Sequence, residues 1–137
     1  MLNTGLKRKV KVVLAKSALD SHDVGLRYVS KLLVDAGMEV VVIRYDRIEE
    51  LVKVAIEEDI DCIGVSYYCT GLEYEIPTLM GMLKDKKLDD LVVLVGGCIS
   101  DEEKEKLTNW GVKGVFTPGE KPGNEVINCI LSNLTPR

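Results

Sequence analysis

The sequence predicts an α/β protein in which one parallel sheet carries helices on both faces. Short, continuous runs of apolar residues alternate five times with segments whose apolar residues recur at three- and four-residue spacing. The apolar runs are rich in Val and Ile and lack polar alternation, which is typical of parallel strands buried on both faces. The length of 137 residues, without a repeat or an interdomain linker, favours a single domain. These three observations together indicate five strands in one doubly wound sheet.

The first half of the chain contains three predicted strands and two predicted helices. In chain order they cover residues 10–15 (strand), 24–36 (helix), 38–43 (strand), 47–58 (helix) and 60–66 (strand). Leu26, Val29 and Leu33 place one apolar face on the first helix, and Gly37 after it is typical of a C-cap.

The second half contains three helices and two strands. They cover residues 73–86 (helix), 91–95 (strand), 101–109 (helix), 113–116 (strand) and 123–134 (helix). Proline is tolerated only in the first turn of a helix, so Pro77 predicts that the first of these helices begins near Ile76. Ser100 or Asp101 is expected to cap the next helix.

Alternating strands and helices favour the strand order 2-1-3-4-5, the flavodoxin-like (Rossmann-like) arrangement. Residues 10–135 then form the domain, and residues 1–9 precede it as an N-terminal extension. The order of the strands reverses between strands 1 and 3. Ligands of open α/β sheets bind at the carboxyl ends of the strands at such a switch point.

Composition excludes several functions. Hydrophobic residues make up 46% and charged residues 29%, and the net charge of −4 argues against non-specific binding of nucleic acid. No apolar run is long enough to span a membrane, and the basic start lacks the apolar core of a signal peptide, so a cytoplasmic location is expected. The four cysteines form no C-x-x-C pair, and Cys62 is expected to be a small core residue.

The most informative segment is Asp20-Ser21-His22-Asp23-Val24-Gly25, which lies between the first strand and the first helix. His22 is the only histidine in the chain. A metal-binding imidazole usually donates its other N–H to a carboxylate, and Asp20 is close enough in sequence to accept it. The simpler alternative is that His22 is a polar residue at a helix start and that Asp20 or Ser21 is the N-cap.

Two further segments follow buried strands. Ser66-Tyr67-Tyr68 ends the third strand and Gly96-Gly97 ends the fourth. The chain therefore reads D-x-H-x-x-G, 40 residues, S-x-Y, 27 residues and G-G. Over residues 10–127 it closely resembles the B12-binding domain of methylmalonyl-CoA mutase and related acyl-CoA mutases, whose signature is D-x-H-x-x-G…S-x-L…G-G.

This resemblance implies a cobalamin site. His22 would be the axial ligand of cobalt, with the cofactor's own base displaced, and Asp20 would orient the imidazole. Lys16 would extend this relay to Asp20, although a solvated lysine at a strand end is the alternative. Ser66 would donate a hydrogen bond to the displaced base, or else satisfy the backbone. Three further residues of the first motif are also expected to contact the cofactor: Ser21, Asp23 and Val24.

The same resemblance implies a slot for the nucleotide tail of the cofactor. Gly25, Gly96 and Gly97 would leave room for it, although the last two could also form a simple turn. Its far end would be bordered by Phe116, Thr117 and Pro118, with Phe116 otherwise a core residue. Tyr68 would line the slot where the family has leucine. Val24 and Thr117 also depart from the family, which more often has arginine and glycine there.

By resemblance, the chain is the small subunit of an adenosylcobalamin-dependent acyl-CoA mutase, a carbon-skeleton isomerase of the methylmalonyl-CoA mutase type. The cofactor would supply an adenosyl radical, and no residue of this chain is expected to be catalytic. The acyl-CoA would bind a separate large subunit of barrel type, since such a barrel needs ~250 residues. The rim over residues 69–74 and 98–100 is expected to contact that subunit, through Tyr67, Tyr68, Leu72, Tyr74 and Ile99.

Four alternatives stay open at this point. The chain could be the small subunit of a glutamate mutase, although Lys16 and the segment 116–119 favour the acyl-CoA mutases. It could be a corrinoid protein of a methyl-transfer system, which usually carries a helical domain before the B12 fold. It could also be a non-catalytic B12 carrier or sensor, or a flavodoxin-like module that has lost the cofactor, and Tyr68 keeps these two readings open.

Overall fold

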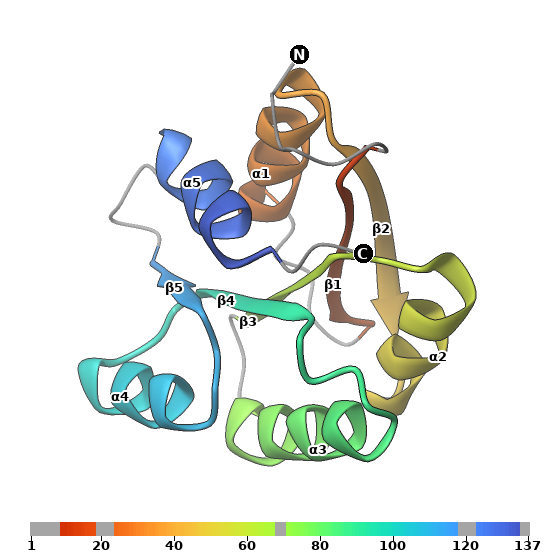
Figure 1. Ribbon diagram of the computed structural model, residues 1–137. Coiled ribbons are helices and arrows are strands. Elements are labelled where there is room, and N and C mark those ends of the chain that lie inside the picture. The colour runs from red at the N-terminus through yellow and green to blue at the C-terminus, as the bar shows by residue number, and fades with distance from the viewer. Residues whose placement is uncertain (1–8, 19–23, 68–70, 118–122, 135–137) are drawn as a thin grey trace.

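A computed structural model describes residues 9–18, 24–67, 71–117 and 123–134 of the chain (Figure 1). Strands and helices alternate throughout. The elements are β1 (Lys11–Ser17), α1 (Val24–Asp35), β2 (Glu39–Tyr45), α2 (Glu49–Glu58), β3 (Cys62–Tyr67), α3 (Leu72–Asp85), β4 (Val92–Gly97), α4 (Asp101–Asn109), β5 (Gly114–Phe116) and α5 (Gly123–Asn133).

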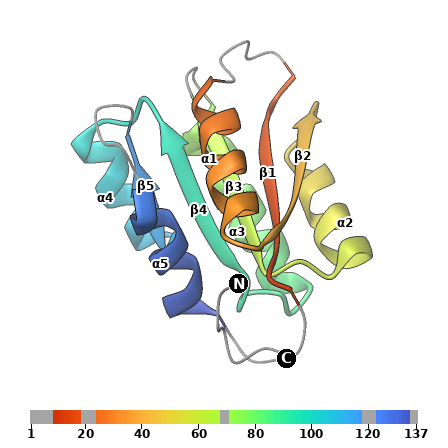
Figure 2. The same ribbon diagram turned by 90° about the horizontal axis from the view of Figure 1, so that it is seen from above.

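The five strands form one sheet in the order β2-β1-β3-β4-β5, and all neighbouring pairs are parallel. Helices α1 and α5 cover one face, and α2, α3 and α4 cover the other (Figure 1). Figure 2 shows the carboxyl ends of the long strands together at one edge, which we call the carboxyl rim. The predicted fold class and strand order are therefore confirmed.

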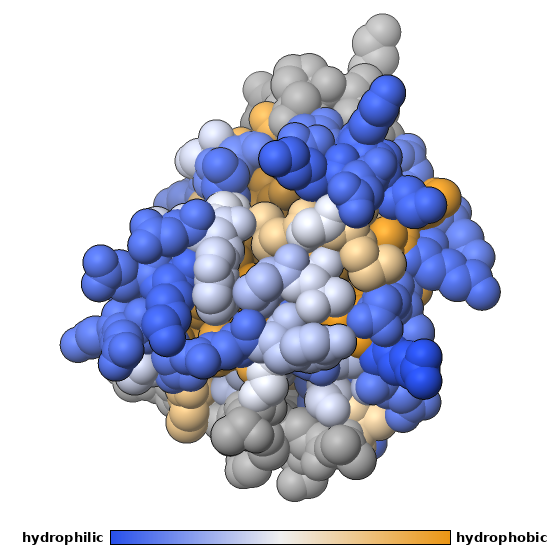
Figure 3. All heavy atoms as spheres, turned by 90° about the horizontal axis from the view of Figure 1, so that it is seen from below, coloured by the Kyte–Doolittle hydropathy of each residue, from blue (hydrophilic) through white to orange (hydrophobic). Residues whose placement is uncertain are grey.

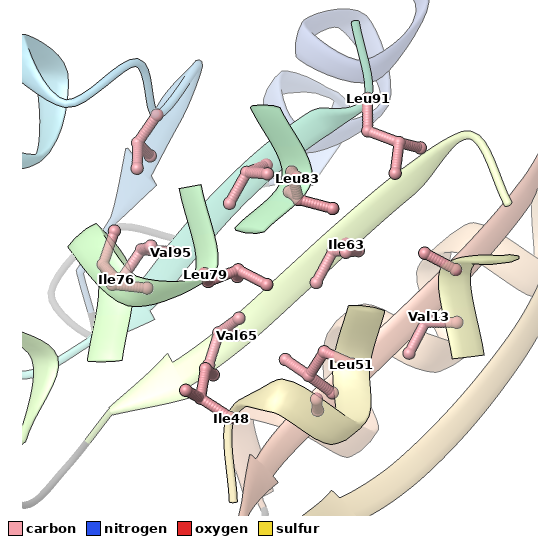
Figure 4. Close-up of a cluster of buried hydrophobic side chains, with 14 of the residues drawn as sticks. Val13, Ile48, Leu51, Ile63, Val65, Ile76, Leu79, Leu83, Leu91 and Val95 are labelled. Carbon is pink, nitrogen blue, oxygen red and sulfur yellow. The ribbon is translucent and has the colours of Figure 1, made fainter. Parts of the chain in front are cut away.

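The alternation of side chains along each strand builds two cores. Val13, Ile63 and Val95 point to the face of α2, α3 and α4, where they pack with Leu51 and Leu79 (Figure 4). The core on the opposite face, under α1 and α5, includes Val12, Leu14, Cys62, Val92 and Leu94. Cys62 has no exposed surface, so its predicted role as a core residue is confirmed, and burial raises the pKa of its thiol.

The start of α3 differs from the prediction. The helix begins at Leu72 rather than near Ile76, and Pro77 lies inside it. Leu72 is buried, and the carbonyl of Gly71 accepts hydrogen bonds from the backbone N–H groups of Tyr74 and Glu75. Apolar packing and backbone hydrogen bonds thus both stabilise the first turn. These contacts offset the one helical hydrogen bond that a proline nitrogen cannot donate.

The predicted cap of α4 is confirmed as a capping box. The backbone N–H of Glu103 donates to Ser100 Oγ at 3.1 Å, and the backbone N–H of Ser100 donates to Glu103 Oε1 at 3.0 Å. This reciprocal pair satisfies two donors at the helix start and holds the chain as it leaves β4.

The outer surface over α2, α3 and α4 is mainly hydrophilic, with only small, separate apolar areas (Figure 3). None of the helices in the described part of the chain is long and apolar enough to cross a membrane.

Candidate functional site

Four predicted cofactor contacts lie side by side at the carboxyl rim. In the register of the sheet, Lys16 of β1 is opposite Ser66 of β3, Ser66 is opposite Gly96 of β4, and Gly96 is opposite Phe116 of β5. We call these four residues the rim row. Residues two positions apart on a strand point to the same face of the sheet. Leu14 and Leu94, which lie two positions before Lys16 and Gly96, belong to the core under α1 and α5, so the row faces these two helices. The sheet thus brings residues 100 positions apart in the sequence into one line.

The polar members of the rim row are buried. Lys16 is 1% exposed and Ser66 is 8% exposed, and in the described residues, buried tyrosines aside, the only other buried polar side chain is Asp61. The alternative in which Lys16 is a solvated strand-end lysine is therefore wrong. Burying an ammonium group is unfavourable unless polar partners compensate it. The burial of Lys16 therefore indicates a role for its charge rather than a role in packing.

The α1/α5 face of the sheet near the rim is lined by small residues. A Cβ added at Gly64 would lie 2.8 Å from Leu14 Cδ2, and one added at Gly114 would lie 2.8 Å from Cys129 Sγ. At Gly96, by contrast, the only described atom within 4 Å of an added Cβ, its chain neighbours aside, is the carbonyl oxygen of Phe116 at 3.3 Å. Side chains therefore cover the sheet over Gly64 and Gly114, whereas no described side chain covers it over Gly96.

Gly97 has a different reason to be glycine. Its φ is +123°, and a Cβ there would collide with the backbone carbonyl of Tyr67. The same carbonyl accepts a hydrogen bond from the backbone N–H of Cys98 at 2.9 Å. The close approach of β4 to the end of β3 therefore requires glycine at position 97 whether or not a ligand binds. This agrees with the alternative in which Gly97 belongs to a simple turn.

A polar cluster lies on the other face, behind Ser66. The hydroxyl groups of Tyr45 and Tyr67 donate to Glu75 Oε1 at 2.8 and 2.7 Å, and their oxygens are 3.3 Å apart. Burial raises the pKa of Tyr67, and the neighbouring Tyr45 and Glu75 raise it further. The cluster ties the start of α3 to the ends of β2 and β3. Sequence reasoning missed it, although a tyrosine at each strand end was a signal that it could have used.

The same cluster corrects part of the predicted docking surface. Tyr67 and Leu72 are each 3% exposed and pack in the core, so they cannot contact a partner. Strand alternation turns Tyr67 away from the α1/α5 face, and α3 begins early enough to bury Leu72. Tyr74 is 72% exposed and Ile99 is half-buried, so these two members are accessible.

Several predicted site residues lie outside the described residues: Asp20, Ser21, His22, Asp23, Tyr68 and Pro118. Val24 and Gly25 are the first two residues of α1, which follows β1 directly across the rim, and Gly25 is half-buried. Thr117 follows β5 and is half-buried. Within the described ranges, no group of three or more His, Cys, Asp or Glu side chains could hold a metal ion.

Comparison with known proteins gives consistent results. The family model described as "B12 binding domain" matches residues 10–127. The 2-hydroxyisobutanoyl-CoA mutase small subunit of Aquincola tertiaricarbonis is 35% identical over 93% of this chain and 94% of that protein. The pivalyl-CoA mutase small subunit of Xanthobacter autotrophicus is 37% identical over 96% of this chain and 88% of that protein.

Among solved structures, a cobalamin-binding protein from Desulfitobacterium hafniense superposes with a TM-score of 0.68 and 24% identity. The match covers 79% of this chain and 53% of that one, and at this identity it supports the fold alone. The family model and the two small subunits, by contrast, each match most of this chain. The chain therefore belongs to the B12-binding domain family, and it is similar over most of its length to the small subunits of two acyl-CoA mutases.

Proposed function

We propose that this chain is the cobalamin-binding small subunit of an adenosylcobalamin-dependent acyl-CoA mutase. The observation that carries the proposal is the rim row, because it sets Ser66 and Gly96, from the second and third segments of the family signature, beside Lys16 and Phe116 on one face. Identity of 35% and 37% to two acyl-CoA mutase small subunits, along nearly their whole length, supports the same class.

The described residues fit a cobalamin tail. Ser66 has a hydroxyl that is nearly buried at the switch point and can donate to the displaced base of the cofactor. Gly96, next to it, carries no side chain on the same face, and the backbone carbonyl of Phe116 borders that position, while the Phe116 ring lies against Gly114. A hydroxyl donor beside an uncovered stretch of backbone suits a flat heterocycle on a flexible tail.

We assign the remaining contacts on the family pattern. His22 would ligate the cobalt, Asp20 would orient its imidazole, and Lys16 would act on Asp20 from the end of β1. Tyr68 lines the tail slot, and Gly25 lets the tail pass the start of α1. When bound, adenosylcobalamin supplies the cobalt–carbon cleavage that begins the rearrangement, while this chain holds the cofactor and tunes its cobalt.

The partner is a separate large subunit of barrel type that binds the acyl-CoA. The rearrangement needs a chamber closed to water, and the described strands and helices of this chain are all committed to the sheet and its two cores. The large subunit covers the carboxyl rim, where Tyr74 and Ile99 are accessible to it. We expect no mutase activity from this chain alone.

Electron paramagnetic resonance of the Co(II) cofactor bound to this chain tests the site. With ¹⁵N-labelled histidine in the protein, we expect the nitrogen coupling to change from that of ¹⁴N to that of ¹⁵N, because His22 is the only histidine. Coupling that stays unchanged would mean that the cofactor's own base remains on cobalt.

Activity is tested separately. The cofactor-loaded chain is assayed with 2-hydroxyisobutanoyl-CoA, pivalyl-CoA and methylmalonyl-CoA, with and without its large subunit. Turnover of at least one substrate in the mixture only is the expected result. Turnover by the isolated chain would contradict the division of labour, and turnover of glutamate by the mixture would support the glutamate mutase alternative instead.

A further inference from the structure

A groove of about 380 Å³ lies between α1 and the edge strand β2, beside the carboxyl rim. Its walls come from the outer side of α1 and from the ends of β1 and β2, which are paired through Lys16 and Arg44. In Figure 2, α1 lies in front of the sheet and β2 forms the edge of the sheet on the right. We call this feature the α1–β2 groove. It lies at the opposite end of the rim row from Gly96 and Phe116, so it is separate from the proposed tail slot and shares only Lys16 with the rim row.

The groove combines positive charge with an apolar surface. Lys16, Arg27, Lys31 and Arg44 line it, and none of the described residues in its lining is acidic. This contrasts with the net charge of −4 of the whole chain. Lys31 forms an ion pair with Asp35 at 3.2 Å, but both side chains are more than half exposed, so water weakens that pair and the charge of Lys31 still acts on its surroundings.

The apolar part of the groove is exposed to solvent. Val34 is 52% exposed and Val42 is 50% exposed, and both line the groove. They are two of only five large hydrophobic residues that are exposed in the described part of the chain. Val34 comes from α1 and Val42 from β2, so two elements present apolar surface to one hollow instead of burying it.

The position of the groove indicates what covers it. β2 is an edge strand with a neighbour on one side only. The groove reaches the carboxyl rim through Lys16 and Arg44, and that rim is the surface that the large subunit covers in the proposed function. A partner that covers the rim and extends past the edge of the sheet therefore meets the groove directly.

We propose that the α1–β2 groove receives a segment of the large subunit that carries both acidic and apolar side chains. Aspartate or glutamate residues of that segment face Arg27, Lys31 and Arg44, and an apolar side chain packs on Val34 and Val42. Interfaces are enriched in arginine, and complementary charge raises the rate of association and selects the partner. Because the groove is small, it is one anchor of a larger interface. This proposal rests on the proposed function.

Charge reversal tests the groove. Lys31→Glu, Arg44→Glu and the double variant are compared with the wild-type chain for association with the purified large subunit, by surface plasmon resonance at 50 and 300 mM NaCl. We expect each single variant to bind about tenfold more weakly at 50 mM salt, mainly through slower association, and the difference to shrink at 300 mM.

Lys53→Glu is a matched control. Lys53 lies on α2 and pairs with Glu57 four residues later at 3.9 Å, as Lys31 pairs with Asp35 on α1. The side chains of Lys53 and Lys31 are 76% and 80% exposed. This control changes the same charge at a similar helix position on the opposite face of the sheet. We expect its affinity for the large subunit to stay within twofold of wild type.

The possible failures are distinguishable. If the wild-type chain binds the large subunit and supports turnover, but Lys31→Glu and Arg44→Glu bind as tightly as Lys53→Glu, the groove proposal alone is overturned. If Lys31→Glu keeps its affinity for the large subunit and instead loses cobalamin binding, the groove serves the cofactor and the proposal is wrong. If the wild-type chain binds cobalamin but no large subunit, the proposed partner fails, and the groove proposal with it.

Discussion

Replacing Gly97 with alanine and replacing Gly96 with alanine add the same methyl group one residue apart, and the structure predicts opposite outcomes. At Gly97 the methyl group would collide with the carbonyl of Tyr67, in a backbone whose φ of +123° alanine rarely adopts. At Gly96 the backbone belongs to a strand, and the nearest described atom to the new methyl group is the Phe116 carbonyl oxygen at 3.3 Å.

The structure sets the size of each effect. For Gly97→Ala, the strained backbone costs about 1–3 kcal/mol. Moving the Tyr67 carbonyl away weakens its 2.9 Å hydrogen bond from Cys98, which adds about 0.5–1.5 kcal/mol. The expected loss of about 2–4 kcal/mol lowers Tm by roughly 6–12 °C for a chain of this length. For Gly96→Ala, the tight contact is offset by the lower flexibility of the unfolded chain, so stability changes by less than about 1 kcal/mol.

Cobalamin binding should show the reverse order of sensitivity. The methyl group of Gly96→Ala enters the opening beside Ser66, so we expect at least a tenfold weaker affinity for adenosylcobalamin in a chain that still folds. Thermal unfolding by circular dichroism measures the first effect, and titration followed by visible absorbance measures the second. If Gly96→Ala lowers Tm as much as Gly97→Ala, the opening is filled. If it is stable and binds with wild-type affinity, Gly96 does not border the cofactor.

Three other substitutions probe the tyrosine cluster, the core and the proposed orientation of His22. Tyr67→Phe removes a hydrogen bond to the Glu75 carboxylate and should cost about 1.5–3 kcal/mol in urea unfolding at pH 7. Because the folded state raises the pKa of Tyr67, the free energy of unfolding of the wild type should have its full value below about pH 10 and should fall as the pH rises further. Tyr67→Phe should show a smaller fall. An equal fall in both proteins above about pH 10 would contradict this reasoning. Leu79→Ala, at a fully buried position, should cost about 2–5 kcal/mol, and a loss below 1 kcal/mol would refute the close packing under α3. Asp20→Asn should weaken cobalamin affinity or reconstituted turnover ~10–100-fold, and no change in either would remove Asp20 from the role of orienting His22.

The order of the sheet could be predicted because it follows from local patterns and general rules. Continuous apolar runs identify buried parallel strands, and helical spacing identifies the segments that connect them. The ends of elements were harder to predict where a distant contact overrides a local preference. Pro77 predicted a later start for α3, whereas the burial of Leu72 and the hydrogen bonds that Tyr45 and Tyr67 donate to Glu75 stabilise an additional turn at the start of the helix.

Parts of the candidate site could be predicted for the same reason. Ser66 and Gly96 end neighbouring strands, and the carboxyl ends of parallel strands meet at one edge, so their proximity follows from topology. The Tyr45–Tyr67–Glu75 cluster was only partly predictable, because a tyrosine at each of two strand ends is a signal in the sequence, whereas no local spacing identifies Glu75 in the first turn of a later helix as their shared partner.

The sequence by itself determined the doubly wound parallel sheet, its strand order, and the rim at which Ser66 and Gly96 lie side by side, because periodicity and strand direction are properties of neighbouring residues. Only the tertiary structure decided that Lys16 is buried, that Gly97 is required by the backbone while Gly96 leaves an opening, and that α1 and β2 enclose a positively charged groove. Burial, steric contact and local charge are set by distances between atoms that are remote in the sequence, and these distances exist only once the helices have packed on the sheet.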